Sequence, residues 1–265
     1  MTMDRNDIYD IIIQAGQSNA AGRGRGPVGE EYLPADNILY LVDRRGERSE
    51  KIPPLVEIAV AAESEDEGGR IGEFSLSFAC RYVRAGYLKD NRKLLIVRAA
   101  VGGTGFFSSK WGPSDILCLR MRALADAALA QNTDNRLVAF LWHQGEQDAE
   151  DRKELGPAER YGAYRAHLLR LFQSVRESYG GKLPVIAGDF CKEWADKLPE
   201  CADAIVAAAK DVCGIIGNAA FIETKDLQSN NQAIGNGDDV HFSRDALRIL
   251  GERYFAAFDK IKGVR

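Results

Sequence analysis

Residues Ile11 to Gly22 read Ile-Ile-Ile-Gln-Ala-Gly-Gln-Ser-Asn-Ala-Ala-Gly. A short apolar run of this kind is typical of a strand that is buried on both faces of a sheet. The glycines at both ends of Gly16–Gly22 permit a tight turn directly after the strand. This turn would hold the Ser18 hydroxyl clear of the sheet edge, although a serine here could also cap a helix that begins near Asn19.

Strand-like and helix-like patterns alternate along the rest of the chain. Short runs rich in Val, Ile and Leu predict five strands, at Ile11–Gln14, Ile38–Val42, Leu94–Val97, Leu137–Leu141 and Leu183–Ala187. Apolar residues at helical spacing predict helices around 117–128, 164–175 and 247–261. Alternation of this kind favours an α/β fold, a three-layer α/β/α sandwich around a central, mainly parallel sheet. No linker divides residues 1–265, which predicts a single domain, and the acidic stretch 63–69 predicts a surface loop.

Composition excludes several classes of protein. The 265 residues carry a formal net charge of -4, so no general basic field would attract nucleic acid. No apolar run approaches the roughly 20 residues that a membrane span needs. The N-terminal residues 1–7 have no apolar segment and predict no secretory signal. Five cysteines without a CxxC pair indicate reduced thiols and a cytoplasmic protein, and the three histidines show no zinc-like spacing with them. We expect no metal and no cofactor.

Two local patterns have mainly structural interpretations. Gly24-Arg-Gly-Pro-Val-Gly29 satisfies G-x-G-x-x-G, but it starts well after the first strand, and Pro27 disturbs the helix entry that a pyrophosphate would use. Arginines gather at positions 23, 25, 44, 45 and 48. We interpret them as solvated loop charges, one of which could hold a substrate carboxylate.

A serine nucleophile needs a base, and the chain has three histidines. His241 has Asp238 three residues before it in a glycine-rich loop, so the carboxylate can fold back and accept the Nδ1 proton. His143 follows a predicted strand and is the rival base. His167 lies within a predicted amphipathic helix and is interpreted as structural. We therefore predict His241 as the base.

Donors for an oxyanion are expected after two other strands. The Gly102-Gly103 pair follows the strand that ends at Val97, and Gln144 follows the strand that ends at Leu141. The Gly103 N–H and the Gln144 amide could both donate to a tetrahedral intermediate. The aromatic residues Phe106, Phe107 and Trp111 could form a wall that stacks on a sugar, or could anchor the loop.

Four segments occur in order across almost the whole chain: Gly16-Gln-Ser-Asn19, Gly102-Gly-Thr104, Trp142-His-Gln-Gly-Glu146 and Asp238-Asp-Val-His-Phe242. Together they resemble the SGNH-hydrolase superfamily, and more narrowly its branch of sialate O-acetylesterases and acetylxylan esterases of carbohydrate esterase family six. The resemblance implies a flavodoxin-like sandwich. It implies Ser18 as the nucleophile, His241 as the base and Asp238 as its acid.

The resemblance also assigns the remaining site residues. It implies oxyanion donors at Ser18, through its own N–H, at Gly103 and at Gln144. Glu146 could replace or assist Asp238, and Asp239 is a further alternative. We also predict that the substrate contacts Gln17, Asn19, Phe106, Trp111 and His143.

The predicted function is a carbohydrate O-acetylesterase that uses an acyl-enzyme mechanism. Its partner would be an acetylated carbohydrate, of the xylo-oligosaccharide or sialic acid type, and the oligomeric state is open. The alternatives are a lipase or thioesterase for longer acyl chains, a carbohydrate-binding protein without turnover, and, more distantly, a nucleotide-binding oxidoreductase.

Overall fold

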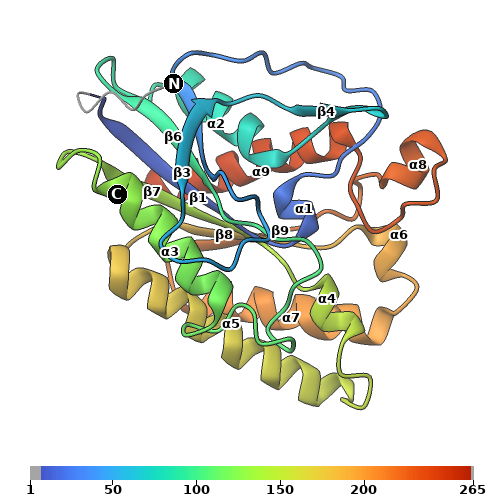
Figure 1. Cartoon of the computed structure of the whole chain (residues 1–265). Helices are drawn as coiled ribbons and strands as arrows, with labels where there is room; N and C mark the ends of the chain where they lie inside the picture. The colour runs from blue at the N-terminus through green and yellow to red at the C-terminus, as the bar shows by residue number, and fades with distance from the viewer. Residues whose placement is uncertain (1–6, 264–265) are drawn as a thin grey trace.

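The computed structural model describes residues 7–263 (Figure 1). Most of the N-terminal segment on which the prediction of no secretory signal depends lies outside this range. None of the helices within the described range is long and apolar enough to cross a membrane. All five cysteines are free thiols.

A seven-stranded sheet forms the centre of the molecule, in the order β3-β2-β6-β1-β7-β8-β9. Six of its strands run parallel and β3 pairs antiparallel with β2 at one edge. The strands are β1 (Tyr9–Gly16), β2 (Ile38–Asp43), β3 (Val56–Val60), β6 (Lys93–Arg98), β7 (Arg136–His143), β8 (Val185–Gly188) and β9 (Ala219–Ile222). The predicted mainly parallel sheet is confirmed.

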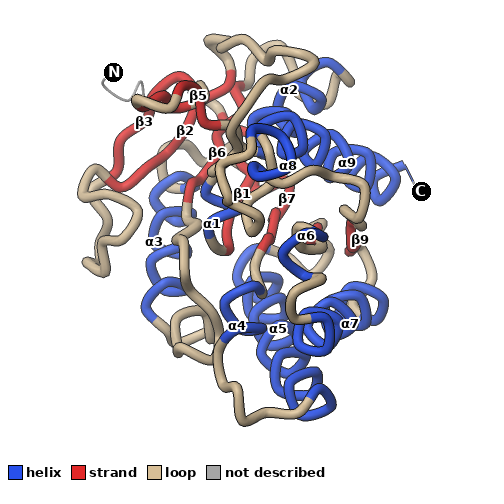
Figure 2. The backbone as a smooth tube through the Cα atoms, turned by 90° about the vertical axis from the view of Figure 1, so that its right-hand side faces the viewer, coloured by secondary structure: helices blue, strands red, loops and turns tan. Residues whose placement is uncertain are grey.

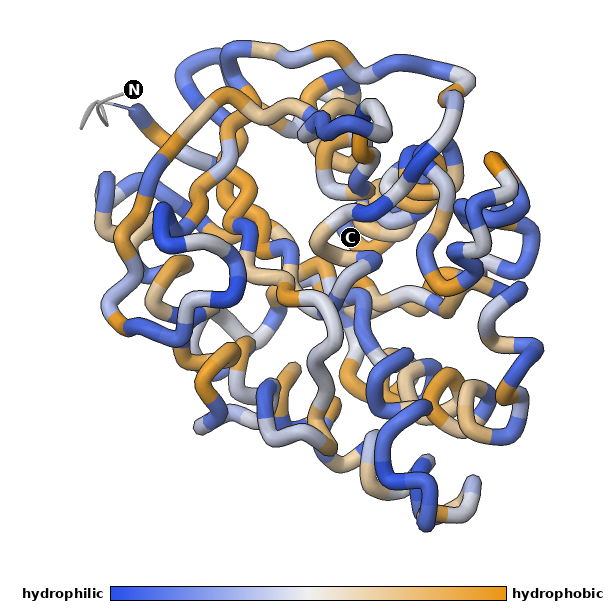
Figure 3. Tube along the Cα trace, turned by 45° about the vertical axis from the view of Figure 1, so that its right-hand side comes forward, coloured by the Kyte–Doolittle hydropathy of each residue, from blue (hydrophilic) through white to orange (hydrophobic). Residues whose placement is uncertain are grey.

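Helices cover both faces of this sheet, as Figures 1 and 2 show. One face carries α2 (Phe74–Arg84) and α9 (Arg244–Gly263), and the other carries α3 (Ile116–Leu129), α5 (Pro157–Tyr179) and α7 (Pro199–Ile215). Alternate residues of β1 supply the two cores, because successive side chains of a strand point to opposite faces. Ile11 and Ile13 pack with the α3–α5–α7 layer, and Ile12 packs with the α2–α9 layer. The apolar strands inside a more polar periphery are visible in Figure 3. The three-layer α/β/α sandwich is therefore confirmed.

Short helices follow the carboxyl ends of four strands. They are α1 (Ser18–Ala21), α4 (Glu146–Glu150), α6 (Lys192–Ala195) and α8 (Asn230–Ile234), which follow β1, β7, β8 and β9. In a parallel sheet these ends meet at one edge, where α/β proteins place their sites. This edge gathers the predicted catalytic residues.

All five strands predicted from the sequence are present, and so are the three helices. The prediction for residues 63–69 is wrong, because this acidic stretch takes part in a small hairpin of β4 (Ser64–Asp66) and β5 (Gly69–Ile71). No helix follows Gly24–Gly29, whose chain runs irregularly through residues 22–37.

Candidate active site

The turn that presents Ser18 depends on glycine at position 16. Gly16 has a φ of +127°, and a Cβ there would lie 2.0 Å from the His143 carbonyl oxygen. This close approach lets the Gln17 N–H donate to the same oxygen at 2.9 Å, which joins the end of β1 to the end of β7. The chain then enters α1 at Ser18.

Ser18 is not a helix cap. It is the first residue of α1, the cap position belongs to Gln17, and no side chain caps this helix. The alternative interpretation of Ser18 as the residue that caps this helix is therefore wrong. Its hydroxyl makes no hydrogen bond within residues 7–263, which leaves it available for chemistry at the edge of the sheet.

His241 lies against Asp238 as the local motif predicts. Its Nδ1 is 2.9 Å from both carboxylate oxygens of Asp238, and its backbone N–H donates to the same carboxylate at 3.3 Å. Asn230 Nδ2 donates to Asp238 at 2.9 Å. Burial alone would raise the pKa of the Asp238 carboxyl, but the hydrogen bonds from Asn230 and His241 outweigh it and lower that pKa. An ionised Asp238 favours the tautomer with the proton on Nδ1, which leaves Nε2 free to accept a proton.

The alternative acids lie elsewhere. Asp239 forms an ion pair with Lys197. Glu146 is buried, accepts a hydrogen bond from Asn19 at 2.7 Å and has its Oε1 3.8 Å from His143 Nε2. Neither carboxylate has a hydrogen bond or ion pair with His241 in the part of the chain that the structure describes. The contacts therefore favour Asp238 as the acid that orients His241.

Asn19 connects the serine turn to the histidine loop. Its Oδ1 accepts the Phe242 N–H at 3.1 Å, and its Nδ2 donates to the Val240 carbonyl at 3.0 Å. These two backbone groups flank His241, and Asn19 itself follows Ser18. The side chain is fully buried, so the predicted contact of Asn19 with substrate is not supported. Its hydrogen bonds instead hold the loops of Ser18 and His241 in one register.

Two backbone N–H groups at this end of the sheet are candidates for binding an oxyanion. The N–H groups of Ser18 and Gly103 make no hydrogen bond within residues 7–263. Gly103 has a φ of +70°, a conformation that favours glycine. A Cβ at the adjacent Gly102 would lie 3.4 Å from Ser18 Cβ, so the glycine loop passes directly beside the nucleophile.

The Gln144 amide is already committed to other acceptors. Its Nε2 donates to Asp148 at 2.7 Å, and the Thr104 carbonyl and Gln17 Oε1 lie within 3.3 Å. A primary amide has only two N–H donors. Asp148 in turn accepts the N–H groups of Phe106 and Phe107, at 3.0 and 2.7 Å. These bonds argue against Gln144 as an oxyanion donor. They connect it instead to the loop that follows Gly102 and Gly103, directly at Thr104 and through Asp148.

Several predicted substrate contacts are core residues. Trp111 is fully buried, donates its Nε1 proton to Thr104 at 2.9 Å and packs edge-on against Trp142. Phe106 is also buried and stacks on His167 at 5.5 Å between ring centroids. The loop-anchor interpretation of these aromatics therefore fits better than a sugar-stacking wall. Stacking also agrees with the structural interpretation of His167.

Gln17 is buried as well. Its Oε1 accepts the N–H of Gln147 at 3.1 Å, so its side chain ties the serine turn to α4. A substrate contact through this side chain is therefore not supported by the structure.

His143 is buried too, which removes it as a rival base. Its side chain lies between Phe74 and Phe242, and Nδ1 is 3.2 Å from the Tyr254 hydroxyl. Burial lowers the pKa of His143 to about 3, so the imidazole is neutral at physiological pH. With no surface exposed, it offers no contact to a substrate either.

The buried carboxyl of Glu146, which lies near His143, should make the stability of the fold depend on pH. Burial raises the pKa of the Glu146 carboxyl to about 7 from 4.5, only partly offset by the hydrogen bond from Asn19. The folded chain then holds a proton that the unfolded chain has lost, so the free energy of unfolding falls as pH rises from 4.5 to about 7. Between pH 5 and pH 8 we expect wild type to lose about 2 to 3 kcal/mol more than Glu146→Gln.

Urea unfolding at both pH values measures this difference. Glu177→Gln, at an exposed position of α5, is the matched control and should follow wild type. An equal pH dependence of wild type and Glu146→Gln would show that Glu146 is ionised throughout this range.

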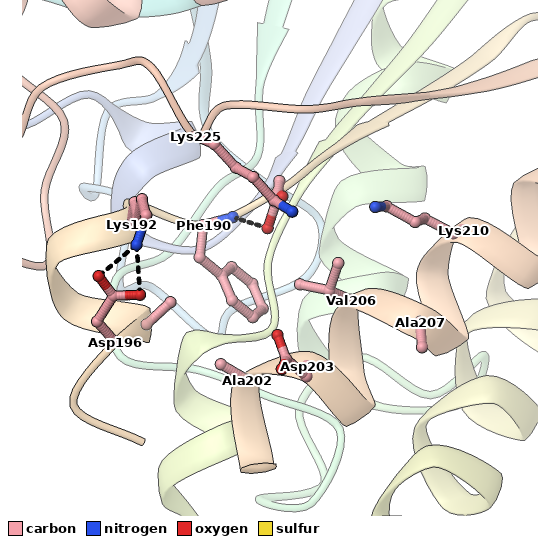
Figure 4. A pocket seen from close by; sticks show the side chains of 11 residues that line it. Phe190, Lys192, Asp196, Ala202, Asp203, Val206, Ala207, Lys210 and Lys225 are labelled. Carbon is pink, nitrogen blue, oxygen red and sulfur yellow. Dashed lines mark hydrogen bonds and ion pairs between the residues drawn. The ribbon is translucent and has the colours of Figure 1, made fainter. Parts of the chain in front are cut away.

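A cavity of about 350 Å³ opens beside β8 and α7 (Figure 4). Phe190, Val206 and Ala207 line it together with Lys192, Lys210 and Lys225. It includes none of the predicted catalytic residues. Within residues 7–263 no cluster of three or more His, Cys, Asp or Glu has the geometry of a metal site.

Comparisons with known proteins identify the family of the chain. A family described as "Carbohydrate esterase, sialic acid-specific acetylesterase" matches residues 8–260. The chain is 22% identical over 277 residues to a probable 9-O-acetyl-N-acetylneuraminic acid deacetylase of Escherichia coli (strain K12), with 88% of this chain and 81% of the relative covered.

Solved structures share the fold. A crystal structure of NanS superposes with a TM-score of 0.76 at 20% identity and covers 99% of this chain and 100% of that one. A structure described as a novel carbohydrate acetylesterase from Xanthomonas citri gives a TM-score of 0.63 at 13% identity, over 97% of this chain and 57% of that one.

Proposed function

Because the chain belongs to the carbohydrate esterase family of sialic acid-specific acetylesterases, and is a carbohydrate O-acetylesterase, we propose that it releases acetate from an O-acetylated sialic acid through Ser18. The observation that carries this mechanism is the pair formed by His241 and Asp238 at 2.9 Å. Asn19 binds the backbone on both sides of His241 and follows Ser18 directly. The segments that carry the nucleophile and the base are therefore joined by hydrogen bonds of Asn19.

The reaction proceeds in two steps. Ser18 Oγ attacks the acetyl carbonyl while His241 Nε2 takes its proton, and Asp238 stabilises the imidazolium that forms. The N–H groups of Ser18 and Gly103 hold the oxyanion, and His241 then protonates the leaving sugar oxygen. His241 takes a proton from water as the water attacks the acetyl-serine, and then returns that proton to Ser18 Oγ as acetate is released. Each oxyanion donor contributes about 3 kcal/mol in the transition state.

The role of Gln144 in this mechanism is indirect. Its bonds to Asp148 and Thr104 fix the loop that carries Gly103. It acts as a positioning residue for the oxyanion site.

Hydrolysis of three ester substrates tests the proposal. These are an O-acetylated sialic acid, an acetylated xylo-oligosaccharide and a 4-nitrophenyl octanoate, assayed without added metal. We expect the highest kcat/KM on the sialic acid ester. A higher kcat/KM on the xylo-oligosaccharide would indicate that acetylated xylan fragments are the substrate. A higher kcat/KM on the octanoate ester would indicate a lipase. Sugar binding without hydrolysis of any ester would leave a binding protein.

We further propose that the chain acts in the cytoplasm and as a single domain. Five free cysteines support a reducing compartment. One continuous sheet from β3 to β9 supports one domain.

A further inference from the structure

The turn after β2 brings a guanidinium to the nucleophile. A Cβ placed on Gly102 would lie 3.4 Å from Ser18 Cβ and 3.9 Å from Nη2 of Arg48. The serine and the arginine therefore flank the same glycine from two different loops. The distance from Ser18 Cβ to Arg48 Nη2 cannot exceed the sum of those two distances. A sugar residue with its ester is long enough to reach from one to the other.

Arg48 differs from the other arginines of its cluster. Arg23 pairs with Glu47 at 2.8 Å, Arg25 pairs with Asp66 and Arg44 pairs with Glu57 at 3.5 Å. Arg45 donates to the Pro53 carbonyl at 2.9 Å. Arg48 is exposed and has no ion pair or hydrogen bond with any of residues 7–263.

The carboxylates of the same turn do not neutralise Arg48. Glu47 is engaged by Arg23, and Glu50 is engaged by Lys110 at 2.8 Å. A free positive charge thus stands beside the nucleophile. A guanidinium binds carboxylates through two parallel N–H donors, a geometry that an ammonium does not offer.

We propose that Arg48 binds the carboxylate of an acidic O-acetylated sugar while its acetyl group lies at Ser18. This inference rests on the proposed function and identifies what selects an acidic over a neutral sugar. The arginine touches the substrate but takes no part in bond making. Arg48 would determine substrate preference by raising the affinity for sugars that have a carboxylate.

A matched pair of substrates isolates this contact. One is an O-acetylated sialic acid with a free carboxylate, and the other is its carboxyl methyl ester, which keeps the same acetyl group. The measured quantity is the ratio of kcat/KM for the free acid to that for the methyl ester. A charge-assisted contact predicts a ratio well above one for wild type, and a fall of this ratio by about tenfold to hundredfold in Arg48→Gln.

Two further variants sharpen the test. Arg48→Lys keeps the positive charge but loses the two parallel N–H donors of the guanidinium. Its ratio of kcat/KM for free acid to methyl ester should therefore lie between those of wild type and Arg48→Gln. Arg44→Gln, in the same segment but paired with Glu57, should keep the wild-type ratio.

The outcomes separate the two proposals. A wild-type ratio near one, or the same ratio in wild type and Arg48→Gln, would overturn the role of Arg48 and leave the esterase function standing. Hydrolysis of 4-nitrophenyl acetate but of neither sugar ester by wild type would instead overturn the proposed substrate, and the inference with it.

Discussion

Ser18→Ala should lower kcat for acetate release by about 10⁴- to 10⁶-fold if Ser18 is the proposed nucleophile. The hydroxyl has no hydrogen-bond partner among the described residues, and α1 has no side-chain cap to lose. We therefore expect the thermal midpoint of the variant to stay close to that of wild type. Hydrolysis of 4-nitrophenyl acetate and circular dichroism measure the two properties.

Ser178→Ala is the matched control for this variant. Ser178 is exposed near the C-terminal end of α5, where the chain returns toward the start of β8. It should retain wild-type turnover. Equal activity in wild type and Ser18→Ala would remove Ser18 from the mechanism.

Asp238→Asn should lower kcat by about 10²- to 10⁴-fold, because the imidazole loses the acceptor that fixes its tautomer and stabilises its charge. The adjacent carboxylate provides a close control. Asp239 pairs with Lys197 rather than with His241, so Asp239→Asn should change kcat by less than about threefold. Steady-state kinetics on the same ester, with both variants side by side, measure the difference.

The same comparison decides between the possible acids. Glu146 contacts Asn19 and His143, so Glu146→Gln should affect turnover less than Asp238→Asn does. Activity that survives Asp238→Asn but is lost in Glu146→Gln would assign the acid to Glu146.

The central strands could be predicted from sequence because burial on both faces leaves continuous apolar runs. Edge strands do not show this signal. β3 alternates partly exposed residues at the rim of the sheet, and all four residues of β9 are only half-buried. α7 is not among the helices predicted from the sequence, although Pro199 stands in its first turn, where proline is favoured.

The site was predictable where its chemistry is local in sequence. His241 and Asp238 are three residues apart, so a single turn brings them together. The contacts of Asn19 join residues more than 200 positions apart, and no local pattern reveals them. Burial of Trp111 depends on Trp142 from another element, so a loop aromatic could be either a wall or an anchor until the packing was known.

The most direct measurement of the mechanism is a search for the acetyl-enzyme. Wild type is mixed with excess 4-nitrophenyl acetate, quenched in acid during turnover, digested and analysed by mass spectrometry. The mechanism predicts one acetyl group on the peptide that contains Ser18, and none on that peptide in Ser18→Ala. Turnover with an acetyl group trapped on a different side chain, and none on Ser18, would contradict it.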